Sequence, residues 1–142
     1  GTNLIFDNNE IMARNNGATA SLVLQNDGGS VRIGNAAVPS GYKFAIDGKM
    51  ICEELKVQLQ GSWPDYVFSE KYKLTDLTEL SEFIQKNKHL PNIPSAAEVE
   101  KNGIEVGDMQ KRMIEKIEEL TLYILELENR VKKLEQTNAI KN

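Results

Sequence analysis

The sequence predicts an α+β fold: a β-rich segment, a small helical region, and a long C-terminal helix that pairs with copies of itself. Three observations predict it. Short apolar segments alternate with polar residues over residues 1–60, capping residues flank two amphipathic stretches within residues 61–107, and residues 108–142 carry an apolar repeat of three and four. We therefore expect a homo-oligomer with a β-rich segment (residues 1–60), a small mixed head (residues 61–107) and a C-terminal parallel coiled coil (residues 108–142).

Composition excludes several classes of protein. The 142 residues are 40% hydrophobic and 27% charged, which is typical of a globular chain. The net charge of -4 disfavours nucleic acid as a partner, because phosphate binding requires a basic surface. No apolar run approaches the length that crosses a bilayer, so we expect no membrane insertion. Because the chain opens with Gly1-Thr2, we expect a fragment of a longer protein.

The first sixty residues predict two β-hairpins and a further strand. Apolar residues alternate with polar ones on both sides of two glycine-containing turns and again beyond them. These residues are Leu22, Leu24, Val31 and Ile33 around the first turn, Phe44, Ile46, Met50 and Cys52 around the second, and Leu55, Val57 and Leu59 beyond. So few large side chains cannot enclose a core, so the segment needs the rest of the chain or copies of itself.

Two short helices are predicted between residues 61 and 107. Thr75 or Asp76 caps the first helix, and the sequence "HLPNIP" ends it. Its apolar stripe consists of Leu77, Leu80, Phe83 and Ile84. In the second helix, Ser95 is the N-cap, Glu98 completes a capping box and Gly103 ends the helix.

The last zone predicts a coiled coil with another chain. The predicted interface residues are Met113, Ile117, Leu120, Ile124, Leu127, Val131 and Leu134. With Ile117, Ile124 and Val131 at heptad position a, the three leucines fall at d. A helix from about residue 108 to 136 would be about 45 Å long. The chain has no second helix of that length, so the partner must be another chain.

Residues beside this repeat indicate the orientation and thickness of the bundle. Arg130 at g and Glu135 at the following e favour parallel strands. Apolar residues off the a/d line are expected to pack on the head, whereas the helix after Glu128 stands free. They are Ile114, Leu122, Tyr123 and Leu125. β-branched residues at a with leucine at d are typical of two-stranded coils, so a dimer is the alternative to a trimer.

Longer sequence blocks carry a resemblance to a known family. The segments "WPDYVF", "HLPNIPSAAEV" and "KIEELTLYILELE" follow a β-rich "GYKFAIDGKMICEELKV". The chain thereby resembles the C-terminal region of bacterial tail-fibre-like proteins. This region is similar in turn to the intramolecular chaperone domain that ends endosialidase-type phage tail spikes and fibres. The resemblance implies a homotrimer, an extracellular location in a virion or phage-tail-like particle, and a role in assembly.

The same resemblance raises the question of self-cleavage, since many of those domains cut themselves with a serine and a lysine. Ser69 takes the serine position, but Leu74 falls where the lysine belongs and Lys73 lies one residue early. In an extended segment, a shift of one residue turns a side chain to the opposite face. We predict that the chain is not an enzyme and that Ser69 is structural. An autoproteolytic chaperone remains an alternative function.

Other candidate sites are sparse, and we expect no cofactor and no metal. His89 is the only histidine and is expected to fill the turn before Leu90-Pro91. The stretch from Asp7 to Glu10 lacks the spacing of a calcium-binding EF-hand loop. Trp63 and Tyr66 could stack on a sugar at a receptor- or glycan-binding fibre tip, a second alternative function. The interpretation we prefer buries these aromatic rings where shaft meets head.

Overall fold

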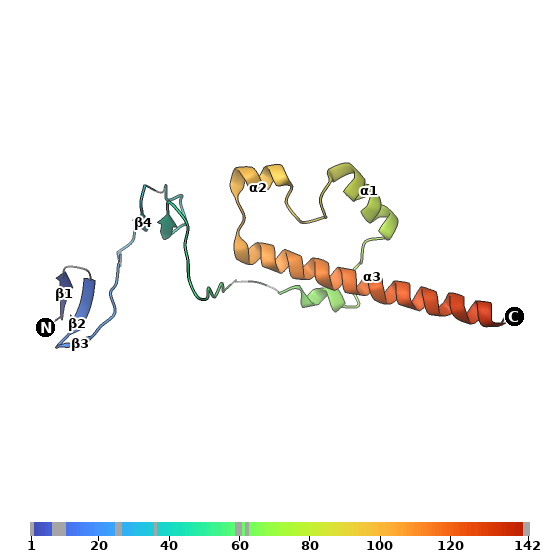
Figure 1. The fold of residues 1–142 in the computed structure, drawn as a ribbon, viewed down its shortest axis with the longest axis horizontal. Coiled ribbons are helices and arrows are strands. Elements are labelled where there is room, and N and C mark those ends of the chain that lie inside the picture. Colours follow the sequence, from blue (N-terminus) through green and yellow to red (C-terminus); the bar gives the residue numbers. More distant parts are fainter. Residues whose placement is uncertain are drawn as a thin grey trace. The chain divides into compact units, whose positions relative to one another are not determined.

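The computed structural model describes residues 2–6, 11–24, 27–35, 37–58, 61 and 63–140. The chain divides into two compact units, Gly1–Leu55 and Lys56–Asn142. Small sheets lie in the first unit, and a 3-10 helix and three α-helices lie in the second (Figure 1). The α+β class is therefore confirmed, with a long helix as the last element.

A three-stranded antiparallel sheet opens the first unit. Its strands are β1 (Thr2–Phe6), β2 (Ile11–Asn15) and β3 (Ala18–Thr19), in that order. Asn16 and Gly17 connect β2 to β3 with φ values of 51° and 81°. A two-residue type I′ turn requires positive φ at both positions, which Asn-Gly adopts readily. Asn16-Gly17 is thus the sequence signal for this hairpin, which is not among the two hairpins predicted above.

Two further strands pair in parallel. Val31 of β4 (Val31–Ile33) lies opposite Phe44 of β5 (Phe44–Ile46), and Ile33 lies opposite Ile46. Both predicted hairpins are therefore wrong: each contributes one strand, and the two strands pair with each other. Alternation shows which face of a strand is apolar but does not identify its partner. Four residues of the predicted hairpin strands lie instead in irregular segments: Leu22, Leu24, Met50 and Cys52.

The strand predicted after residue 53 is also absent from the described residues. Leu55 and Val57 lie in an irregular segment, and Leu59 lies outside the described residues, as does the stretch from Asp7 to Glu10. Of the side chains described between residues 11 and 58, none is buried, and Ile51 is 99% exposed. This segment, as described, builds no core of its own, as its composition predicts.

Both predicted short helices form where their caps place them. In α1 (Leu77–Asn87), the Asp76 carboxylate accepts a hydrogen bond of 2.7 Å from the Thr78 N–H. In α2 (Ala96–Asn102), Ser95 and Glu98 form the reciprocal capping box. The Glu98 N–H donates to Ser95 Oγ at 3.3 Å, and the Ser95 N–H donates to Glu98 Oε2 at 2.8 Å. Capping chemistry thus sets both boundaries.

Replacing Ser95 with alanine is expected to loosen α2. The substitution removes the oxygen that accepts from the Glu98 N–H, and loss of such a cap costs about 1 kcal/mol. Hydrogen exchange at the amides of Ala96–Asn102 should accelerate about fivefold for that free energy. Glu100→Ala is the control, because Glu100 is exposed and forms no part of the box. Equal exchange in both variants would show that the box contributes nothing.

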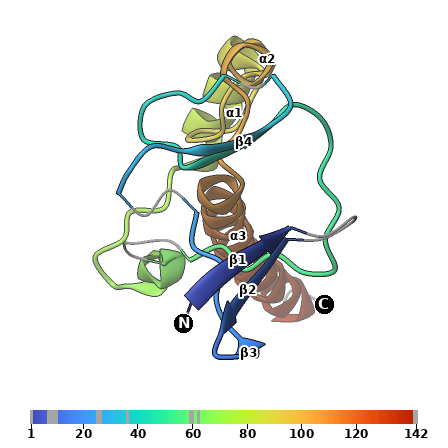
Figure 2. The same ribbon diagram turned by 90° about the vertical axis from the view of Figure 1, so that its left-hand side faces the viewer.

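The longest element is α3 (Val106–Ile140), with 35 residues. It is about 52 Å long at 1.5 Å per residue. The helix begins before and ends after the predicted range of about residues 108 to 136. The 3-10 helix η1 (Pro64–Phe68) packs against it, and α1 and α2 lie on a different side of it (Figures 1 and 2). No described helix is long and apolar enough to span a bilayer. Among the described hydrophobic residues, Val67 and Tyr123 form the buried core.

Candidate assembly surface

Three tyrosine hydroxyls fasten the head to one side of α3. Tyr66 donates a hydrogen bond to Glu115 Oε2, and Tyr72 donates one to Glu119 Oε1. From the helix, the Tyr123 hydroxyl donates to the Thr75 carbonyl oxygen at 2.6 Å. The helix residues Glu115, Glu119 and Tyr123 are called the docking face below. They fix the segment from η1 to the start of α1.

Glu115 is the centre of this docking face. It is only 8% exposed, yet its carboxylate has three partners. Besides Tyr66, Asn92 Nδ2 donates to Oε1 at 3.2 Å, and Lys116 Nζ lies 3.0 Å from the same oxygen. Arg112 Nη1 also donates to the Asn92 carbonyl oxygen at 2.7 Å. The loop after α1 is therefore tied to α3 through the same carboxylate.

The pKa shifts follow from these contacts. Burial alone raises the pKa of Glu115, but hydrogen bonds from Tyr66, Lys116 and Asn92 outweigh it and leave the pKa below its ordinary value. The hydrogen bond to Glu115, together with burial, raises the pKa of Tyr66 to about 12. Burial and the hydrogen bond to Glu119 raise the pKa of Tyr72 as well. The docking face is thus built for a charged Glu115 and neutral tyrosines.

This arrangement predicts a loss of stability in alkali. The pKa of Tyr66 is about 12 in the folded protein and about 10 in the unfolded chain. The stability that this difference contributes is complete below about pH 10 and is lost as the pH rises through about 12. Tyrosinate absorbance should therefore show a late step near pH 12, and Tyr66→Phe should remove the contribution of one tyrosine from it. Urea should return that step to about pH 10. Titration of Tyr66 at about pH 10 in the folded protein would contradict the prediction.

The predicted interface residues lie on a different side of α3 from the docking face. Counting from Ile117 at a, Glu115 falls at f, Glu119 at c and Tyr123 at g, whereas the interface occupies a and d. These residues are exposed, each between 45% and 65%: Met113, Ile117, Leu120, Ile124, Leu127, Val131 and Leu134. We call this row the seam. Docking of the head thus leaves a continuous apolar row open along the helix.

Apolar residues off the seam behave as expected in part. Tyr123 is buried against the head, and Ile114 and Leu122 are half-buried. Leu125 is 49% exposed, so the expectation that it packs on the head is wrong. Leu125 falls at heptad position b. After Glu128, every described residue of α3 is exposed, so no other described part of the chain covers this half.

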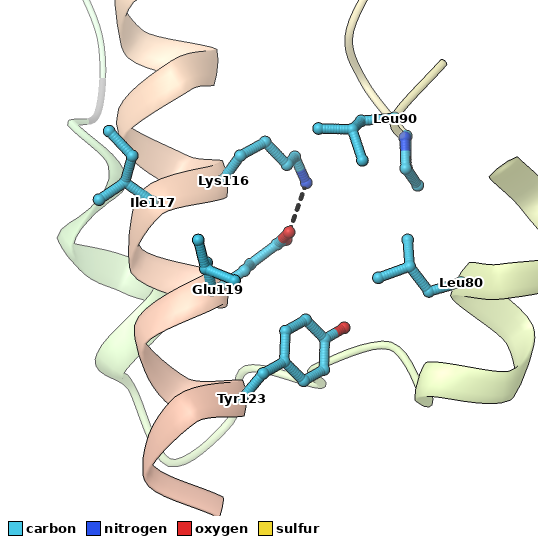
Figure 3. Close-up of a pocket in the computed structure, with 8 residues that line it drawn as sticks. Leu80, Leu90, Lys116, Ile117, Glu119 and Tyr123 are labelled. Atoms are coloured by element: carbon cyan, nitrogen blue, oxygen red, sulfur yellow. Dashed lines mark hydrogen bonds and ion pairs between the residues drawn. The ribbon is translucent and has the colours of Figure 1, made fainter. Parts of the chain in front are cut away.

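A cavity of about 230 Å³ lies beside the seam, between α1, the loop after it and α3. Figure 3 shows Leu80 and Leu90 opposite Lys116, Glu119 and Tyr123. The cavity is lined by Leu80, Leu90, Pro91, Lys116, Ile117, Glu119, Leu120 and Tyr123. Its wall is mainly apolar, and Ile117 and Leu120 belong to both the cavity and the seam.

Ser69 and Lys73 lie at the end of η1. Ser69 is the C-cap of this helix, and its Oγ accepts a hydrogen bond of 3.4 Å from the Lys71 N–H. The Tyr72 N–H donates to the Ser69 carbonyl oxygen at 2.9 Å. The side chains of Ser69 and Lys73 are both exposed. Ser69 therefore lies in a turn at the end of η1, and the expectation that the chain is not an enzyme stays a prediction.

The remaining predicted residues are scattered. Trp63 is about half exposed, against the preferred expectation of burial, and the Tyr66 ring lies 5.9 Å from that of Tyr72. His89 fills the turn as predicted, with its ring edge-on to Phe83 and Nδ1 3.0 Å from the Leu90 oxygen. Cys52 is exposed in an irregular segment, so its predicted place in a strand is wrong.

The sequence predicts that Tyr123 packs on the head, but it does not predict the roles of Glu115 and Glu119 in the docking face. Glu115 and Glu119 are four residues apart on the polar side of the helix, where acidic residues are ordinarily solvated. Tyr66 and Tyr72 lie more than forty residues upstream of their partners. No local pattern joins such distant residues, although tyrosines near a predicted helix that carries unexplained acids are a weak signal.

Comparison with known proteins leaves function to be inferred from the chain itself. No protein-family model, curated protein or solved structure matches it.

Proposed function

We propose that this chain is a structural and assembly module of a trimeric tail-fibre-like protein, carried outside the cell on a virion or phage-tail-like particle. The seam of α3 drives trimerisation and sets the register of the β-rich segment. The observation that carries this proposal is the separation of the seam from the docking face. The head is attached to the helix, yet the a and d residues are all still exposed.

The energetics favour association. Burying the exposed half of each seam side chain contributes about 1 kcal/mol, so three chains gain about 20 kcal/mol. Association costs on the order of 4–15 kcal/mol in lost freedom of motion for each chain that joins. The seam alone is therefore comparable with this cost. The remaining free energy of association has to come from apolar burial elsewhere, including the exposed apolar residues before residue 58.

A trimer fits the upstream half of α3 better than a dimer. Ile114 and Leu125 widen the apolar surface beyond a and d, and Leu125 is about half exposed. A dimer buries a narrower stripe than three helices do, although β-branched a residues with leucine at d are typical of two strands. The resemblance to tail-fibre-like proteins also supports three chains.

The proposal is tested by molar mass. Sedimentation velocity and light scattering over a dilution series should give three times the 15.9 kDa of one chain. A mass of one chain at every concentration would overturn the proposal. Twice the mass of one chain would retain assembly as the function and correct the stoichiometry to a dimer.

A further inference from the structure

The cavity beside the seam is incomplete in a single chain. Its walls are Leu80 of α1 and Leu90-Pro91 of the following loop on one side, and Leu120 and Tyr123 of α3 on the other (Figure 3). Within the described residues, no Cα atom of α1 comes within 8 Å of a Cα atom of α3. The two helices therefore do not pack directly, and the space between them is left apolar and open. We call this space the groove.

Among the described residues, the apolar stripe of α1 has little other cover apart from the edge-on contact between the Phe83 and His89 rings. None of its residues is buried, and Leu77 and Ile84 are about 40% exposed. An amphipathic helix is stabilised mainly by covering such a stripe, so an uncovered one indicates a missing contact. Because Ile117 and Leu120 line both the groove and the seam, whatever covers the seam also reaches the mouth of the groove.

Heptad geometry identifies which part of a second helix arrives there. In a parallel coiled coil, a residue at g lies beside the e residue five positions later on the neighbouring helix. Lys116 and Tyr123 of the groove are at g, so Thr121 and Glu128 of the neighbour are at the facing e positions. The b residue between them on that edge is Leu125. Its exposed side chain is therefore brought to the Tyr123 end of the groove.

We propose that the groove of one protomer is closed by the α3 helix of a second copy, whose Leu125 packs between Leu80 and Tyr123. This inference rests on the proposed function and names the contact through which the head of one chain holds the helix of another. Each protomer then contributes one groove and one Leu125. The contact repeats around the assembly, so every head is fixed to two helices.

The polar residues at the rim are compatible with this occupant. Thr121, which would face Lys116, is uncharged, and its Oγ1 donates to the Ile117 carbonyl oxygen of its own helix at 2.8 Å. Lys116 is already neutralised by Glu119 at 2.7 Å and Glu115 at 3.0 Å. The approaching edge thus brings no like charge to the lysine and leaves no unpaired donor against the apolar wall.

The contact can be tested by cross-linking. In a Cys52→Ser background, chains with Leu80→Cys are mixed under refolding conditions with differently tagged chains that carry Leu125→Cys, and a short bis-maleimide is added. We expect a covalent product that contains both tags. In the matched control, the second chain carries Asn129→Cys in place of Leu125→Cys. Asn129 is at position f, on the outer side of the coil, so this pair should give no mixed product.

A third variant separates the two proposals. Leu127→Cys lies at d and should cross-link to its own copy in any parallel assembly. If Leu127→Cys cross-links and the Leu80/Leu125 pair does not, the seam forms but the groove has another occupant, and this inference is overturned. If neither cross-links and the chain sediments as a monomer, the proposed function fails as well. A mixed product with Leu80 and Leu125 supports both.

Discussion

Replacing Ile124 with aspartate is expected to leave a monomer at concentrations at which we propose that the unmodified chain is a trimer. Ile124 is 57% exposed in the single chain, so the substitution costs the folded monomer little. In the assembly, three carboxylates would meet at one a layer. Lost apolar burial alone costs about 1 kcal/mol per chain, or about two orders of magnitude in the trimer association constant. Charge burial adds to this. Sedimentation velocity measures the result.

The matched control is Asn129→Asp. It introduces the same charge about one helical turn away, at f, where the helix is exposed on the side away from the seam. This variant should remain a trimer with unchanged helical circular dichroism. A trimeric Ile124→Asp variant would show that α3 associates through a different face, or that the assembly is held together by the β-rich segment instead.

Replacing Glu115 with alanine is expected to detach the head from α3. The change leaves the Tyr66 hydroxyl and the Asn92 amide without their acceptor and removes one of two carboxylates beside the partly buried Lys116. Breaking a buried charged hydrogen-bond network of this kind costs about 3 kcal/mol. The free energy of unfolding of the second unit should fall by that amount in urea, followed by fluorescence of Trp63, the single tryptophan.

This measurement is best made in the Ile124→Asp background, so that association does not contribute. Glu128→Ala is the control on the same helix: Glu128 pairs with Lys132 at 2.7 Å, but both side chains are more than half exposed. Such a pair contributes about 0.5 kcal/mol or less. If the two variants lose equal stability, Glu115 does not anchor the head and the hydroxyl of Tyr66 has no structural role.

The helices could be predicted from the sequence because their signals are local. Asp76, Ser95 and Gly103 set boundaries through contacts with residues at most four positions away. The repeat in α3 likewise lies within one element, so the exposed seam follows from spacing alone. Boundaries and apolar faces of this kind need no knowledge of the rest of the fold.

The strand pairing and the hydrogen bonds of Glu115 and Glu119 depend on distant residues, and the sequence does not predict them. Val31 and Phe44 each lie in an alternating segment, yet nothing local indicates that they pair with each other in parallel. The partner of Glu115 likewise comes from 49 residues upstream. A short alternating segment with few apolar residues fits several pairings of similar free energy.

The separation of docking face and seam has a consequence for how the chain matures. The ribosome synthesises the strands and the head before α3. The upstream segment is therefore made before α3 is present to align it with the same segment of other chains. Closure of a head onto its own helix is a unimolecular step, whereas the proposed association through the seams would depend on the local concentration of finished chains. If the chains associate in this way, synthesis of many copies from one messenger RNA would speed assembly. Synthesis at low concentration would leave folded monomers whose seams are still exposed.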